Sequence, residues 1–480
     1  MKAIIGIDLG AQSVQVANVG PIGEPMLLPN HEGQYSTSSA ILFADDNIVV
    51  GGYAKEAAGI EEHAFAEFLR DIGRGITHKT PHGTFSPSDL CTLLLRPLIE
   101  HVRLVYGEAS AVTIAIPHNL SGEGRLEILR AATLAGIYKP NLVNDNTAEA
   151  LYLRNAHKLQ EGKYLLVTLR AGTADATVFE VAGDYLSIVS ASGVQQLGSN
   201  DLRHSMTGIV SEKISMKVGK KVTRDDLVMD YCVGGYNLDR IIQGLGTRKT
   251  FQHIVRSLEF GRIDIEISRK EFDERIASHT KQLECLIESA LDKAGVTPRN
   301  LNGCFLSAPE IDRPFWAPRI GSALGIEPFS TPEGSIAMGA ALYAASKSRD
   351  EDLPLMGQNE LKSIKVQDVA PYFVGILEID WLTQTKRNRI VIPKGELLPC
   401  KRTFELVADD SGRIPEIVVT TSYVAGDDAE QVIVLKTINP KQSKAHSKQT
   451  LTITMNENGR TSATLRNDDD DSSRFMEINT

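Results

Sequence analysis

The sequence has 480 residues and a formal net charge of −10, with 42% apolar and 23% charged residues. This length exceeds one ordinary hydrophobic core, so two to four domains or subdomains are expected, and the composition excludes wholesale disorder. No apolar run reaches the roughly 18 residues of a membrane span. The acidic balance disfavours non-specific nucleic-acid binding. The five dispersed cysteines, without a C-x-x-C pair, are typical of reduced thiols in a cytoplasmic protein.

Residues 1 to about 346 alternate strand-like and helix-like segments. The apolar N-terminus reaches Asp8 early, which favours a first strand over a signal peptide. Ser86 and Pro87 predict the start of one helix. Ser268 and Glu271 form a capping-box pattern that opens another, which we expect to end at Gly295. The pattern predicts an α/β region.

A weak internal repeat lies within this region. Residues 4–16 read as strand, tight turn and strand, and residues 165–178 repeat the design about 160 residues later. Each alone is an ordinary β-hairpin. Together they predict two similar lobes around a cleft.

The C-terminal part has a different pattern. Residues 347–367 are polar and charged, which is typical of a linker. From Ile376 onward, short β-branched runs alternate with turn residues, including a hairpin turn at 456–459. The pattern predicts an all-β sandwich of about 100 residues. The run Asp468–Asp471 is interpreted as a solvated loop or chain end.

Several segments resemble motifs of the heat-shock-protein-70 (DnaK) chaperone family and follow one another in the family's order. Each is weak alone, but the ordered series is specific. The matching segments are 5–10 (family G-I-D-L-G), 113–117 (V-T-V-P), 134–137 (I-A-G-L), 143–150 (I-N-E-P-T-A-A-A), 197–201 (L-G-G-E-D), 339–341 (G-A-A), 368–376 (D-V-T-P-x-x-x-G-I) and 390–399 (V-L-I-P-R-N-x-x-I-P).

The resemblance implies a two-lobed, actin-like α/β nucleotide-binding domain over 1–346, a linker over 347–367 and a peptide-binding-like β-sandwich domain over 368–480. The sequence ends where the family's helical lid would begin, so we expect no lid. The implied function is that of a cytoplasmic chaperone, or chaperone-like binder, of unfolded or extended polypeptide. Its implied cofactor is ATP or ADP with Mg²⁺. Its partners would include a specific client or co-chaperone, and neither nucleic acid nor membrane.

The resemblance also implies a nucleotide site. Asp8 would be the Mg²⁺-shell carboxylate, Asp145 would position the attacking water, and Thr173 and Asp175 would complete the catalytic set. Backbone N–H groups of two glycine-containing turns would hold the phosphates. The remaining nucleotide-binding residues would be Gly10, Ala11, Gln12, Gly172, Gly198, Ser307 and Ala308.

Three departures from the family fall on catalytic positions. Leu69 stands where the family has its catalytic lysine, although the neighbouring Arg70 could substitute for that charge. Thr168 replaces an aspartate and Arg170 replaces a glycine in the second turn. Asp145 is also shorter than the family's glutamate. We therefore expect ATP hydrolysis to be weak or lost.

Two further groups are implied by the resemblance. Pro117 and Arg125, eight residues apart as in the family's P-A-Y-F-N-D-x-Q-R, match the family's relay between nucleotide site and peptide domain, and otherwise read as a strand end and a surface arginine. Lys365 and Gln367 weaken the family's apolar linker strand. Four apolar residues after the Gly375–Ile376 pair are candidates for peptide binding, with sandwich core as the alternative: Leu377, Ile379, Trp381 and Leu382.

Two alternative functions remain at this point. One is an actin-fold enzyme of another class, such as a sugar or acetate kinase, which the β-rich tail disfavours. The other is a non-hydrolysing scaffold or regulator whose β domain binds one partner.

Overall fold

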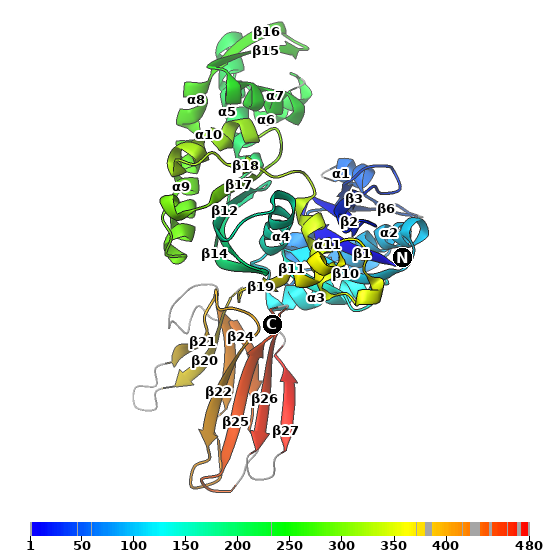
Figure 1. The fold of residues 1–480 in the computed structure, drawn as a ribbon. Coiled ribbons are helices and arrows are strands. Elements are labelled where there is room, and N and C mark those ends of the chain that lie inside the picture. Colours follow the sequence, from blue (N-terminus) through cyan, green and yellow to red (C-terminus); the bar gives the residue numbers. More distant parts are fainter. Residues whose placement is uncertain are drawn as a thin grey trace. The chain divides into compact units, whose positions relative to one another are not determined.

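Figure 1 shows a computed structural model of the chain, which forms two compact units by its internal contacts. The first unit contains Met1–Leu159, Asp184–Ser187 and Gly334–Thr480, and the second contains Gln160–Gly183 and Ile188–Glu333. The structure describes residues 2–45, 47–58, 60–231, 233–370, 372–379, 386–414, 416–422, 433–440, 444–457, 459–467 and 472–478.

The first unit begins with a mixed sheet in the order β11-β10-β1-β2-β3. β11, β10 and β1 run parallel, and β1, β2 and β3 are antiparallel. Its strands are β1 (Ala3–Leu9), β2 (Ser13–Val19), β3 (Pro25–Leu28), β10 (Ala109–Ile116) and β11 (Asn141–Asn144), with β4 (Thr37–Ser38) paired to β2, and its main helices are α2 (Pro87–Tyr106), α3 (Gly122–Leu134), α4 (Asp145–His157) and α11 (Ser335–Lys347).

Strand β1 separates two layers by its alternating side chains. Ile5 and Ile7 belong to the core that includes residues of α2 and α3. Gly6 faces α11, where an added Cβ would lie 2.1 Å from the backbone nitrogen of Ala341. Helix α11 therefore packs directly on the strand backbone, as Figure 1 shows.

The predicted start of the first helix is confirmed. Ser86 caps α2 and forms a reciprocal capping box with Asp89, and Pro87 is the first helical residue. Smaller elements complete this part of the unit: α1 (Gly52–Ala57), β5 (Ala40–Phe43), β6 (Ile48–Val50), β7 (Ala64–Ala66), β8 (His78–Thr80), β9 (Gly83–Phe85) and the 3-10 turn η1 (Phe68–Asp71).

The second unit repeats the sheet design of the first. Its order is β18-β17-β12-β13-β14, with β18, β17 and β12 parallel and the β12–β13 hairpin antiparallel. The hairpin repeat read from the sequence thus belongs to a larger repeat of strand order. The strands are β12 (Gly162–Leu169), β13 (Thr173–Ala182), β14 (Tyr185–Gln195, whose first three residues belong to the first unit), β17 (Gly303–Ser307) and β18 (Phe329–Ser330).

One predicted helix of the second unit is divided in two. Ser268 caps the first part as expected, accepting from the N–H of Glu271. At Ile276 the backbone leaves helical geometry, with φ −103° and ψ 13°, so a second helix begins at Ala277. The remaining elements are α5 (Ser199–Val218), α6 (Arg224–Met229), α7 (Gly235–Thr247), β15 (Thr250–Ser257), β16 (Gly261–Ser268), α8 (Arg269–Arg275), α9 (Ala277–Lys293), η2 (Pro298–Asn300) and α10 (Arg313–Leu324).

The segment expected to be a linker contains η3 (Asp350–Asp352), α12 (Gln358–Ser363) and β19 (Lys365–Gln367). β19 pairs in parallel with the first three residues of β14, Tyr185–Ser187. The ammonium of Lys365 lies 4.9 Å from the ring centroid of Tyr185, a cation–π contact. The polar linker strand is therefore paired despite its lack of leucines.

The C-terminal residues form two four-stranded antiparallel sheets, β21-β20-β23-β24 and β22-β25-β26-β27, which share one apolar core. Gly459, with φ +71°, lies in the predicted turn between β25 and β26. Trp381, Leu382 and the Asp468–Asp471 run lie outside the described residues. The strands are β20 (Phe373–Ile379), β21 (Lys386–Ile392), β22 (Cys400–Val407), β23 (Ile417–Ser422), β24 (Ile433–Ile438), β25 (Lys448–Met455), β26 (Thr461–Asn467) and β27 (Ser473–Glu477).

Candidate functional site

The turn between β1 and β2 carries the first group of predicted site residues. Asp8 is half-buried near the end of β1. The N–H of Gly10 donates to the carbonyl of Ser13 over 3.1 Å, and the hydroxyl of Ser39 donates to the carbonyl of Gly10 over 2.7 Å. Gln12 is exposed, and its amide donates to Glu67 Oε1 over 3.2 Å. The turn is thus tied to two neighbouring segments of its own unit.

Glu67 also lies near Leu69, the position where the family has its catalytic lysine. Its Oε2 lies 3.3 Å from Arg70 Nε, so one carboxylate faces both Gln12 and Arg70. Leu69 is half-buried and packs against the core of the first unit. The only cation of η1 is therefore paired with Glu67, and Leu69 serves packing.

The turn between β12 and β13 is fixed to the start of α5. The N–H of Ser199 donates to the carbonyl of Arg170 over 2.9 Å, and that of Asn200 donates to the carbonyl of Ala171 over 2.7 Å. A Cβ on Gly198 would lie 2.2 Å from the Arg170 carbonyl oxygen. Only glycine allows this close approach, so Gly198 positions the turn through its lack of a side chain.

Both turns present main-chain donors. Among the described residues, no hydrogen-bond acceptor meets the N–H groups of Ala11, Gln12, Ala171 and Gly172. Successive open N–H groups in a tight turn suit an anion such as a phosphate. These backbone donors therefore fit the expected ligand.

The carboxylates near the turns are fewer than in the family. Thr168 is buried and pairs in register with Asp175 on β13 and with Ser307 on β17. A hydroxyl thus occupies the position where the resemblance places an aspartate. Asp8 and Asp175 supply one carboxylate to each sheet, and no group of three or more metal-ligating side chains occurs among the residues that the structure describes. A single carboxylate on a sheet suits a Mg²⁺ ion held through water more than one ligated directly.

The segment after β17 is held by an arginine and an aspartate that the sequence did not identify. Arg313 donates to the carbonyls of Ala308, over 2.9 Å, and Thr331, over 2.6 Å. The hydroxyl of Ser199 donates to Asp312, which is 1% exposed. Burial raises the pKa of the Asp312 carboxyl, opposed by the Ser199 hydrogen bond. Arg313 therefore stabilises the local fold by binding two main-chain carbonyls.

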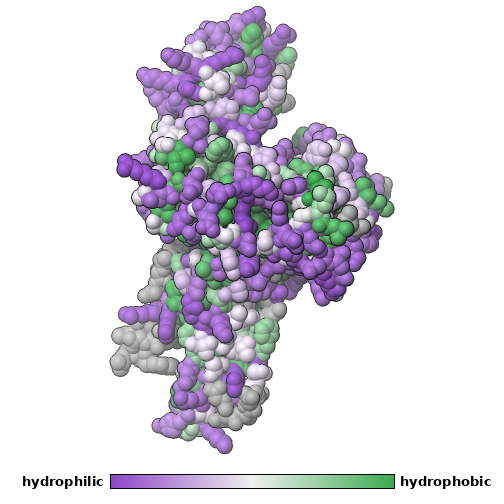
Figure 2. Space-filling view, viewed as in Figure 1, coloured by the Kyte–Doolittle hydropathy of each residue, from purple (hydrophilic) through white to green (hydrophobic). Residues whose placement is uncertain are grey.

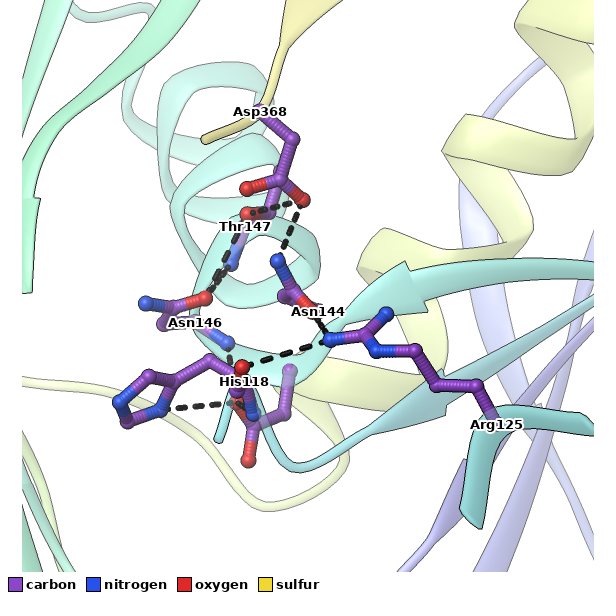
Figure 3. A network of polar contacts seen from close by, with 7 residues as sticks. His118, Arg125, Asn144, Asn146, Thr147 and Asp368 are labelled. Carbon is purple, nitrogen blue, oxygen red and sulfur yellow. Dashed lines mark hydrogen bonds and ion pairs between the residues drawn. The ribbon is translucent and has the colours of Figure 1, made fainter. Parts of the chain in front are cut away.

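Arg125 lies inside the first unit and is 2% exposed, which excludes the surface-arginine reading. Its Nη2 donates to Asn144 Oδ1 over 2.6 Å and to the carbonyl of His118 over 3.3 Å, as Figure 3 shows. Pro117 is exposed directly after β10, and its carbonyl accepts from Leu120 over 3.0 Å. Arg125 thus connects the loop after β10 with the end of β11.

The polar chain continues to the residue that follows β19. Asn144 Nδ2 donates to Asp368 Oδ2 over 2.8 Å, and the hydroxyl of Thr147 donates to the same oxygen over 3.1 Å (Figure 3). Burial raises the pKa of the Asp368 carboxyl, although these two donors and Arg125 oppose the shift. We call Arg125, Asn144, Thr147 and Asp368 the linker network. The contacts of this network cannot be predicted from local sequence patterns, because its members are separated by up to 243 positions (125 to 368).

Asp145 begins α4 beside this network. Its Oδ1 accepts from the N–H of Asn146 over 2.8 Å and from the N–H of His118 over 3.3 Å. The ring Nδ1 of His118 lies 3.9 Å from the same oxygen. The position at a helix N-terminus favours a carboxylate here.

The β domain places two of its four candidate residues on β20. Leu377 is half-buried and pairs with Val418 on β23 and Asn388 on β21, and Ile379 ends the strand. Trp381 and Leu382 lie outside the described residues, so the proposed peptide cleft stays a prediction.

Among the described residues, no helix has the length and apolar character needed to cross a membrane.

Comparison with known proteins gives a consistent result. The sequence model of the Hsp70 protein family matches residues 4–83 and 75–462. The chaperone protein DnaK of Thermus thermophilus is 25% identical over 435 residues, covering 84% of this chain and 68% of that protein. The chaperone protein DnaK of Mycoplasmopsis pulmonis is 24% identical over 441 residues, covering 90% and 71%. The chaperone protein dnaK3 of Synechocystis is 24% identical over 438 residues, covering 84% and 54%. With the family match extending from β1 to the start of β26, this chain belongs to the Hsp70 family.

Proposed function

We propose that the chain is a chaperone-like binder of extended polypeptide, in which a two-lobed, actin-like domain (1–346) controls a β-sandwich peptide domain (368–480) through residues 347–367. The linker network carries this proposal. Asp368, the first residue of the β domain, is held by Asn144 and Thr147 beside Arg125. Such a network supports signalling between a nucleotide and a peptide domain.

The nucleotide in this proposal is ATP or ADP with Mg²⁺. The open N–H groups of the two turns would hold its phosphates, and Gly10, Gly172, Thr173 and Gly198 would shape those turns. Asp8 and Asp175 would hold metal-bound waters, and Asp145 would orient the attacking water. Ser307 and Ala308 would lie near the nucleoside. The bound metal would neutralise phosphate charge.

We further propose that hydrolysis is weak or lost. Thr168 supplies no negative charge, Leu69 supplies no positive charge, and Arg170 adds a cation at the second turn. Losing one charge contact to a transition state typically costs about 2.7–4 kcal/mol, or about 10²–10³ in rate. Losses at several such positions remove most of the rate even where they are not additive.

A non-hydrolysing scaffold is the second candidate. The pairing of Arg70 with Glu67 favours it, because this pairing leaves no positive side chain of η1 for a phosphate. In this case, the β domain would bind one specific partner independently of nucleotide.

The decisive experiment measures release of a labelled, extended apolar peptide from the full chain with and without ATP and Mg²⁺. ATP should change the release rate in the wild type, and Asp368→Asn should abolish the change without altering ATP affinity. Asp350→Asn is the matched control, because Asp350 pairs with Lys362 in the same connecting segment.

Absence of ATP binding, with peptide binding retained, would reject the chaperone cycle in favour of the scaffold. An ATP response that Asp368→Asn leaves intact would show that the linker network does not carry the signal. Trp381→Ala should weaken peptide binding without unfolding the β domain, and an unchanged affinity would contradict the peptide-cleft assignment.

A further inference from the structure

His118 is a buried ionisable residue to which the family resemblance assigns no role. It directly follows Pro117, where the family motif has alanine, and only 8% of it is exposed. It lies between β10 and α3 and is shown in Figure 3. A buried imidazole is retained at low cost only where polar groups face it.

The polar groups around His118 come from two helices. From α4, Asp145 Oδ1 lies 3.9 Å from the ring Nδ1 and accepts from the His118 main-chain N–H over 3.3 Å. From α3, the guanidinium of Arg125 donates to the His118 carbonyl over 3.3 Å. The next charged group, Asp368, is reached through Asn144. One residue thus faces the candidate water-orienting carboxylate with its ring and the linker network with its carbonyl.

The two departures from the family at this place are complementary. Asp145 is one methylene shorter than the family's glutamate, and His118 is larger than the family's alanine. The ring lies against the oxygen that two main-chain N–H groups already bind. The ring Nδ1 lies 3.9 Å from this oxygen, which is longer than a hydrogen bond, so the ring acts on the carboxylate by close polar contact, and such a contact counts for more in a buried setting than in water.

We propose that His118 is a positioning residue. Its ring holds the Asp145 carboxylate at the start of α4, and this fixes the first turn of α4, which provides Thr147 to Asp368. The role of Asp145 toward nucleotide rests on the proposed function, whereas the effect on the linker does not.

The test compares hydrogen exchange of residues 364–370 in the full chain, without nucleotide, across wild type and three variants. His118→Ala should speed exchange about fivefold, the factor expected for a loss of about 1 kcal/mol. His118→Asn, which keeps a donor where Nδ1 lies, should stay within about twofold of wild type. His31→Ala is the control, because His31 is exposed beside Glu32 and far along the chain from the linker network.

A second comparison restores the family's pair in one chain. His118→Ala combined with Asp145→Glu should return linker exchange to within about twofold of wild type, because the longer side chain carries its carboxylate into the space that the ring leaves. His118→Ala with wild-type exchange, or His118→Asn as fast as His118→Ala, would overturn the proposal. Failure of ATP to bind any variant would instead reject the proposed function, since the exchange comparison needs no nucleotide.

Discussion

The two sheets that carry the hairpin turns share a strand order but differ in how each turn is supported. In the first unit, two side-chain contacts, from the Ser39 hydroxyl and in the Gln12–Glu67 pair, hold the turn together with the N–H of Ser39, which donates to the Gln12 carbonyl over 3.0 Å. In the second, main-chain contacts from the start of α5 hold the turn, and Gly198 permits them. Each turn keeps its backbone geometry through a different set of hydrogen bonds. The shared strand order therefore tolerates different residues in the two turns. The chemistry of the turns could therefore change while the fold was kept.

Restoring the family's charges in both units should have the largest effect on the rate of ATP hydrolysis. It tests directly whether the divergence in the two units is what reduces catalysis. Leu69→Lys in the first unit combined with Thr168→Asp in the second should raise the single-turnover rate of ATP hydrolysis by about 10² or more. The two single variants, measured separately, show whether the first or the second unit limits the rate of ATP hydrolysis. A wild-type rate equal to that of the double variant would contradict a loss of catalysis at these positions.

Gly339→Ala should cause the largest loss of stability. An added Cβ would lie 1.7 Å from the carbonyl oxygen of Ala148, so α4 and α11 must separate, at a cost of about 3 kcal/mol. Gly208→Ala on α5 is the matched helical control, since its Cβ meets only the flexible end of Arg275. It should be neutral or stabilising by up to about 1 kcal/mol. Urea unfolding measures both, and equal stabilities would show that α11 moves freely from α4.

Ser335→Ala should have an intermediate effect on the same helix pair. The Ser335 hydroxyl donates to Glu149 Oε1 over 2.7 Å, and Glu149 is fully buried between α4 and α11. Removing this donor should cost about 2 kcal/mol. Adding Glu149→Ala, the residue in the family motif, should recover most of the loss. A double variant less stable than Ser335→Ala would contradict this explanation.

The smallest expected effect concerns pH and the second unit. Burial raises the pKa of Asp312 above its ordinary value of 3.8, so folding favours the protonated carboxyl. The stability that protonation contributes is present at low pH and is lost as pH rises through the raised pKa. Asp312→Asn should remove this loss between pH 4 and pH 7, a slope below about 1.4 kcal/mol per pH unit.

The measurement uses the fluorescence of Trp316, which is buried on the neighbouring turn of α10, in a Trp381→Phe background. If the stability of the Asp312→Asn variant and that of its parent depend on pH in the same way, Asp312 is no more easily protonated in the folded protein than in the unfolded protein.

The sequence predicted the elements whose signals are local. Capping residues such as Ser86 and Ser268 located helix starts, and β-branched runs located the strands of the C-terminal sheets. The division at Ile276 was missed, because the apolar spacing continues through the break while the backbone geometry does not. Local patterns therefore predicted where elements begin better than where they are interrupted.

The candidate site was predicted less completely. The resemblance located Arg125 and Asp145 but not the roles of His118, Asn144 or Asp312, which depend on contacts between distant segments. Arg313 illustrates the same limit. Its place in the sequence gives no sign of its role, and only the structure shows that it binds two main-chain carbonyls.

Strand β21 has a consequence for how copies of the chain behave in solution. Among the described strands it lies at one end of its sheet's order, and Lys386, Arg387 and Arg389 are exposed along it. An open sheet edge is a template for pairing with another chain, and a row of cations makes two such edges repel each other. Figure 2 shows hydrophilic residues over much of the visible face, with hydrophobic groups among them. The row of cations should thereby protect the chain from self-association, and raising the salt concentration should weaken that protection.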